Sequence, residues 1–89
     1  MDSIHIKTAS GFEADISPYA MDDIRLLDDL NSLDNGDYGA VSRVLSRLLG
    51  EKQKEALYNF CYDPEKGRTT ITKVSAVLME IFTTPELKK

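Results

Sequence analysis

Residues 37–50 read D-Y-G-A-V-S-R-V-L-S-R-L-L-G, and this stretch decides the fold. Its apolar side chains recur every three or four residues, which places them on one face of an α-helix. They are Tyr38, Val41, Val44, Leu45, Leu48 and Leu49. Asp37 is placed to cap the first turn, and Gly50 has the backbone freedom to end the helix. Since one amphipathic helix must bury its apolar face against something, the rest of the chain has to supply the other elements.

The N-terminal residues predict a β-hairpin over about residues 3–16. Apolar and polar side chains alternate there, as in half-buried strands, the apolar ones being Ile4, Ile6, Phe12, Ala14 and Ile16. A three-residue loop that ends in Gly11 fixes the register. This register pairs oppositely charged side chains across the strands, namely Lys7 with Glu13 and His5 with Asp15. We therefore interpret His5, the single histidine, as a cross-strand partner and not as a catalytic base.

Helical patterns fill most of the remaining chain. They predict helices at about residues 18–33, 38–49, 51–62 and 70–83. Ser17 and Pro18 begin the first of these helices, and Thr69 or Thr70 caps the last. The apolar face of the last helix consists of Ile71, Val74, Val77, Leu78, Ile81 and Phe82. Residues 85–89 are expected to form a short mobile tail.

These elements predict an α+β fold that is mostly α, an N-terminal β-hairpin followed by a compact bundle of about four helices. A chain of 89 residues is expected to form one domain, 1–89. No apolar run approaches the roughly 20 residues that cross a bilayer, and the N-terminus lacks a signal-peptide pattern, so we expect a cytosolic protein without a membrane partner. The single cysteine, Cys61, lies on an apolar face and is expected to be a buried thiol.

Charge is distributed unevenly along the chain. Residues 1–37 hold nine acidic and two basic residues, a net charge of −7, whereas residues 38–89 hold nine basic and six acidic residues, a net charge of +3. The total of −4 makes the chain a poor ligand for phosphate backbones, so we expect no nucleic-acid partner. The two parts can attract each other within one molecule or between copies, although solvated charged faces are the commoner reason for such a pattern.

A helix-turn-helix over residues 36–62 is the DNA-binding alternative. Its turn would fall at Gly50, but the second helix offers Glu51 and Glu55 beside Lys52 and Lys54, which is a poor recognition surface.

Catalytic and metal-binding motifs are missing from the sequence. There is no G-x-S-x-G, no phosphate-binding glycine loop, no histidine pair and no plausible cysteine and histidine arrangement. Neither the loop at Gly36 nor the turn after Asp63 has the ligand spacing of an EF-hand. We assign no catalytic, cofactor-binding or metal-binding residue and expect a protein that is not an enzyme.

A second face of the last predicted helix is small and semi-polar. It carries Thr72, Ala76 and Met79. Methionine is an adaptable contact residue, so this face is a candidate for binding a partner helix, with ordinary surface as the alternative.

The order of these segments resembles the tail assembly chaperones of long-tailed phages and prophages of Gram-positive bacteria. The resemblance rests on K-T-A-S-G-F-E-A-D-I (7–16), D-D-I-R-L-L-D-D-L (22–30), D-N-G-D-Y (34–38), V-L-S-R-L-L-G-E-K-Q-K-E-A-L (44–57), D-P-E-K-G-R (63–68), V-S-A-V-L-M-E-I-F (74–82) and E-L-K-K (86–89). Asp28 stands where a glutamate is expected, a small departure.

This resemblance implies a non-enzymatic assembly factor in the host cytoplasm that is absent from the finished virion. Such proteins bind the tape measure protein and keep it soluble until tail tube subunits polymerise around it. The family often makes a longer, frameshifted form that recruits the tail tube protein.

Many copies along a rod imply a homo-oligomer, and the charge pattern suggests how copies meet. We expect an acidic set on one copy, Asp22, Asp28 and Asp29, to face a basic set on the next, Arg43 and Arg47. The alternative from another class is a small phage or bacterial regulator, a repressor or an antitoxin-like inhibitor that binds protein or DNA.

Overall fold

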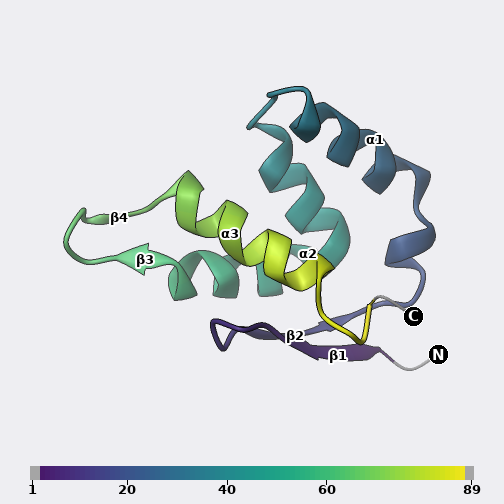
Figure 1. Cartoon of the computed structure of the whole chain (residues 1–89), viewed down its shortest axis with the longest axis horizontal. Coiled ribbons are helices and arrows are strands. Elements are labelled where there is room, and N and C mark those ends of the chain that lie inside the picture. Colours follow the sequence, from purple (N-terminus) through teal and green to yellow (C-terminus); the bar gives the residue numbers. More distant parts are fainter. Residues whose placement is uncertain (1–2, 88–89) are drawn as a thin grey trace.

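The computed structural model describes residues 3–87 and contains a hairpin followed by three helices (Figure 1). The elements are β1 (Ile4–Lys7), β2 (Glu13–Ile16), a 3₁₀ turn η1 (Ala20–Asp22), α1 (Ile24–Asp34), α2 (Ala40–Phe60), β3 (Tyr62–Asp63), β4 (Arg68–Thr69) and α3 (Ile71–Phe82). The predicted α+β, mostly helical class is confirmed. The helices number three within residues 3–87, and not about four, because the two central predictions form one bent helix.

The N-terminal hairpin has the predicted register. His5 lies opposite Asp15 and Lys7 opposite Glu13, and Gly11 closes the loop with a φ of 101°. Among residues 3–87 no ion pair joins Lys7 to Glu13, because the Glu13 carboxylate bonds His5 instead. His5 Nδ1 lies 2.8 Å from Asp15 Oδ1, and His5 Nε2 lies 2.9 Å from Glu13 Oε1. Both hydrogen bonds raise the pKa of His5, and the bond to Asp15 has the larger effect. The histidine thus acts as the cross-strand partner that the sequence predicts.

One glutamine fixes the hairpin beneath α2. Gln53 Oε1 accepts the Asp15 backbone N–H at 2.7 Å, and Gln53 Nε2 donates to the Asp15 carbonyl at 2.7 Å. These bonds satisfy both backbone groups of one residue on an exposed strand edge, which would otherwise be open to pairing with another chain.

The first predicted helix, at residues 18–33, begins later than expected. Its N-cap is Asp23, whose side chain accepts the Arg25 N–H at 2.9 Å, and Ser17 instead accepts the N–H of Tyr19 in the preceding turn. Asp23 has extended backbone angles, and an aspartate in that conformation is a strong helix start, so it separates η1 from α1. Leu26 is buried on α1, whereas Ile24 is exposed.

The predicted helices at residues 38–49 and 51–62 are the two halves of α2. Gly50 lies between them with φ 79° and ψ 165°, and the ribbon changes direction there (Figure 1). The helix begins at Ala40, not at Tyr38, and Asp37 accepts the N–H of Gly39 in the turn before it. Tyr38 is consequently outside the helix and 64% exposed, so its predicted place in the core is wrong.

A second hairpin follows α2 where a helix end and a turn are expected. Strands β3 and β4 pair antiparallel, with Asp63 opposite Arg68, and the Gly67 N–H donates to the Asp63 carbonyl at 2.8 Å. The Thr69 hydroxyl donates to the Tyr58 carbonyl at 2.9 Å and thereby attaches this hairpin to the end of α2.

The last helix, α3, is capped by Thr70, whose hydroxyl accepts the Lys73 N–H at 3.2 Å, as predicted. Four residues of α3 are buried, Val74, Val77, Leu78 and Ile81. Ile71 is 62% exposed, so its predicted burial is wrong. In the predicted mobile tail, Leu87 is partly buried against the core, and residues 88–89 lie outside the described residues.

The core lies where these elements meet on α2. α1 packs along the first half of α2, α3 lies beside the second half, and the N-terminal hairpin lies beneath the bend of α2 (Figure 1). Residues with no exposed surface come from the N-terminal hairpin, from both halves of α2 and from α3; they include Ile6, Ile16, Leu45, Leu57 and Ile81. Within residues 3–87, no helix is both long enough and apolar enough to span a lipid bilayer.

Candidate functional site: an apolar groove beside the bend of α2

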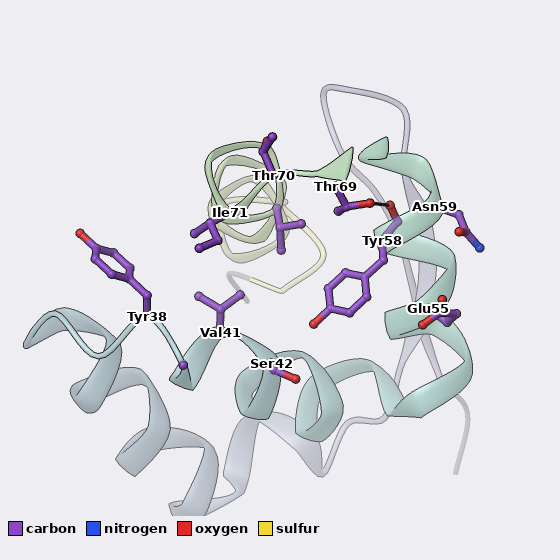
Figure 2. Close-up of a pocket in the computed structure, with 11 residues that line it drawn as sticks. Tyr38, Val41, Ser42, Glu55, Tyr58, Asn59, Thr69, Thr70 and Ile71 are labelled. Carbon is purple, nitrogen blue, oxygen red and sulfur yellow. Dashed lines mark hydrogen bonds between the residues drawn. The ribbon is translucent and has the colours of Figure 1, made fainter. Parts of the chain in front are cut away.

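A groove of about 450 Å³ lies between the two halves of α2 and the start of α3. It is lined by Tyr38, Gly39, Val41, Ser42, Glu55, Tyr58, Asn59, Thr69, Thr70, Ile71 and Val74, and we call it the α2–α3 groove. Tyr38 and Tyr58 lie on opposite sides of it, with Val41, Ser42 and Ile71 between them (Figure 2).

The walls of the groove come from segments far apart in sequence. Residues 38–42 precede the bend at Gly50, residues 55–59 follow it, and residues 69–74 carry β4 into α3. The bend brings the first two segments to face each other, and the bond between Thr69 and Tyr58 holds the third. Sequence reasoning missed the groove because no single stretch contains it.

Large apolar side chains remain exposed at its edge. Tyr38 is 64% exposed and Ile71 is 62% exposed, while Val41 and Val74 beneath them are buried. Tyr38 lies just before α2, and Ile71 is the first residue of α3. Each extends the apolar face of its helix beyond the part that neighbouring elements cover. The signal that would have indicated the groove is therefore an apolar stripe that extends to the very start of a helix.

Electrostatically, the groove is nearly neutral. Among the described residues that line it, only Glu55 carries a formal charge. No ion pair involving Glu55 occurs within residues 3–87, and the side chain is exposed. The lining thus offers apolar contact, a few hydroxyl and amide groups and one free carboxylate.

Lys54 connects the two halves of α2 across the bend. Its Nζ lies 2.8 Å from the Ser46 hydroxyl in the first half and 3.0 Å from Glu51 Oε2 in the second. The Glu51 carboxylate raises the pKa of Lys54, which keeps the amine charged. The bend is thereby fixed by a charged hydrogen-bond network as well as by the glycine.

Three of the five residues predicted for self-association meet within one chain. Arg43 Nε lies 3.1 Å from Asp29 Oδ1, and Arg47 Nε lies 2.9 Å from Asp29 Oδ2. Asp22 and Asp28 are exposed and make no ion pair among residues 3–87. The attraction between the acidic and basic parts of the sequence therefore operates inside the molecule, between α1 and α2, and a contact between copies stays a prediction.

Asp29 has the surroundings of a structural ion pair. Its side chain is only 13% exposed, and hydrogen bonds from Arg43 and then Arg47 lower the pKa of its carboxyl group. Arg43 also binds Asp37 Oδ2 at 3.1 Å, and Arg47 lies 3.9 Å from Asp23. We call these residues the α1–α2 ion cluster; they are Asp23, Asp29, Asp37, Arg43 and Arg47. The cluster connects the N-cap and the middle of α1, and the turn that follows α1, to the first half of α2.

We expect Asp29→Asn to remove a pH-dependent part of the stability. The folded pKa of Asp29 lies below its unfolded value of 3.8, so its contribution is present above that value and is lost as the pH falls through the folded pKa. Urea unfolding from about pH 7 to about pH 3 should show the native protein more stable than Asp29→Asn near neutrality, and the difference shrinking below about pH 4.

Asp28→Asn is the matched control for this experiment, since Asp28 lies on the same helix, is exposed and has no ion pair among the described residues. Its difference from the native protein should be small at every pH. If Asp29→Asn behaves like Asp28→Asn near neutrality, the α1–α2 ion cluster does not stabilise the fold.

The predicted partner-binding residues form a separate surface. Thr72, Ala76 and Met79 are all exposed on α3, Met79 by 63%, and none of them lines the α2–α3 groove. Successive residues rise about 1.5 Å along a helix, so Met79 lies about 12 Å beyond Ile71 along α3. The two surfaces can therefore be tested separately.

Reactive side chains do not gather at the groove. Cys61 is 2% exposed, as predicted, and burial raises the pKa of its thiol, which lowers its reactivity. In the part of the chain described, no three side chains of the metal-ligating types lie close enough to hold an ion.

The chain matches no protein-family model, no curated protein and no solved structure.

Proposed function

We propose that this protein is a phage tail assembly chaperone that binds the tape measure protein and keeps it soluble in the host cytoplasm during tail morphogenesis. The order of motifs along the chain, which resembles that of this family, supports the proposal, and so does the exposed apolar surface. A longer, frameshifted form would add the contact with the tail tube protein, and several copies along one tape measure protein would form a homo-oligomer. The chaperone itself would be absent from the mature virion.

The observation that carries the proposal is the amount of uncovered apolar surface on a small helical domain. Nine large apolar side chains are exposed within residues 3–87: Tyr19, Met21, Ile24, Leu27, Tyr38, Phe60, Tyr62, Ile71 and Met79. Scattered apolar residues on a surface are ordinary, but those at the edge of a concave apolar groove indicate a protein-binding site. A chaperone for a helical, aggregation-prone client needs such a surface to cover the apolar faces of the client.

The charged groups also favour a protein partner over a nucleic acid. Arg43 and Arg47 are paired with Asp29, and the Lys54 amine is bound by Glu51 and Ser46. These three bases are therefore already paired within the chain, and the chain as a whole has a net charge of −4, which disfavours binding to a duplex.

Co-purification tests this proposal. The tagged chain is expressed with the products of its neighbouring genes, and we expect it to retain a long helical protein that is insoluble when expressed alone. The captured protein must also become soluble when it is expressed together with the chain. An unrelated insoluble helical protein serves as the control client, and the chain should neither retain it nor make it soluble. If the chain instead retains duplex DNA in a salt-dependent way and rescues no neighbour, it is a regulator and the chaperone proposal is wrong.

A further inference from the structure

The α2–α3 groove has an apolar lining with one acidic group, and this combination restricts what can bind there. Tyr38 and Ile71 lie at its edge with more than half of their surfaces exposed, above the buried Val41 and Val74. A partner that covers these two residues would bury apolar surface that the fold leaves in water, which is favourable at about 25 cal/mol per Å².

The shape of the groove favours a helix as the occupant. Its walls approach from three segments and enclose about 450 Å³, with side chains converging from opposite sides (Figure 2). An amphipathic helix fills such a groove with residues spaced at i, i+3, i+4 and i+7. An extended strand would need free backbone groups to pair with, but most of the lining residues belong to helices and most of their backbone groups are bonded within those helices.

The charge of the occupant follows from Glu55. This carboxylate is the only charged side chain among the described lining residues, and it has no ion-pair partner within residues 3–87. Two other charged residues close to the groove are already paired, Asp37 with Arg43 and Lys54 with Glu51. A lysine or arginine beside the apolar face of the occupant would complement Glu55.

We propose that the α2–α3 groove binds one amphipathic helix of the client, with apolar residues on Tyr38 and Ile71 and a lysine or arginine on Glu55. This inference rests on the proposed function, because the helix is taken to belong to the tape measure protein. It assigns the contact to the groove and not to the face of Thr72, Ala76 and Met79.

The test compares Ile71→Glu with Met79→Glu in binding to a soluble fragment of the tape measure protein. The two residues lie on the same helix and are 62% and 63% exposed, and both substitutions add one negative charge. We expect Ile71→Glu to weaken binding by about tenfold or more, because it places a charge where the apolar side of the bound helix packs, and Met79→Glu to leave binding nearly unchanged. Unchanged melting temperatures would show that both variants fold.

A second pair of variants tests the charge. Glu55→Gln should weaken binding by roughly two- to fivefold at low salt and should reduce its salt dependence, as expected for an exposed ion pair. Glu65→Gln is the control, since it removes the same charge from an exposed residue outside the groove. Equal effects of the two glutamine variants would mean that Glu55 acts only through net charge.

The outcomes separate this inference from the proposed function. If the native chain does not bind the tape measure protein at all, both are wrong. If the native chain binds and Ile71→Glu binds equally well, or Met79→Glu loses as much affinity, the chaperone function stands and the groove assignment is overturned. Loss confined to Ile71→Glu and Glu55→Gln supports the groove.

Discussion

Replacing Ile81 with alanine should lower the free energy of unfolding by about 2 to 5 kcal/mol. Ile81 has no exposed surface and lies in the apolar cluster that joins α3 to α2 and the N-terminal hairpin. The substitution loses the transfer free energy of the deleted methyl and methylene groups and leaves a cavity behind. Small domains have a total stability of only about 5 to 15 kcal/mol, so urea unfolding should show a large shift of the midpoint.

Ile71→Ala is the matched control, since it makes the same chemical change on the same helix. Because 62% of the surface of Ile71 is exposed, Ile71→Ala should change the free energy of unfolding by less than about 0.5 kcal/mol. The pair also tests the helical periodicity directly, because the sequence assigns both residues to one buried face. Equal losses for the two variants would show that Ile71 is covered in solution, which would contradict the exposed edge of the groove.

The elements that depend on local chemistry were predictable from the sequence. The N-terminal hairpin follows from alternating residues and a three-residue loop with glycine at its end, and its register is as predicted. The start of α3 follows from the two threonines before an apolar repeat, Thr69 and Thr70, of which Thr70 is the cap. In both places a few adjacent residues determine the hydrogen bonds, so one sequence is enough.

Elements that depend on competition between neighbouring signals were not predictable. Two helix starts compete here, one at Ser17 and Pro18 and the other at Asp23. The structure uses Asp23, so η1 remains a separate turn before α1. The hairpin of β3 and β4 has two residues in each strand, too few to show an alternating pattern.

Only part of the candidate site was predictable, for a similar reason. The charge asymmetry indicated an attraction between residues 1–37 and the rest, and the structure places that attraction within one molecule, at Asp29, Arg43 and Arg47. A count of charges cannot tell an internal pair from one between copies. The groove depends on the direction that α2 takes after Gly50, which no local pattern encodes.

Replacing Gly50 with alanine should destabilise the protein by about 1 to 3 kcal/mol through backbone strain. At φ 79° and ψ 165°, Gly50 occupies a region that residues with a Cβ atom rarely adopt. An added Cβ would meet no atom within 4 Å, so the cost is conformational and does not come from a clash with neighbours. Urea unfolding measures the loss.

Gly39→Ala is the control, because Gly39 has ordinary helical angles, φ −61° and ψ −23°, at the start of the same helix. Its new Cβ would lie 3.2 Å from a side-chain oxygen of Asp37, which can move, so we expect a change within about 1 kcal/mol. If Gly50→Ala is as stable as Gly39→Ala, the chain accommodates a Cβ at the bend, and the bend is not held by the glycine.

The consequence of Gly50→Ala for binding follows from the geometry of α2. Alanine favours a continuous helix, and a straighter α2 would carry Glu55 and Tyr58 away from Val41 and separate Lys54 from Ser46. We therefore expect Gly50→Ala to lose affinity for the tape measure fragment by more than its stability loss explains, measured where the variant is still folded. Full affinity in a folded Gly50→Ala variant would show that the client does not need both halves of α2, and would leave the start of α3 as its contact.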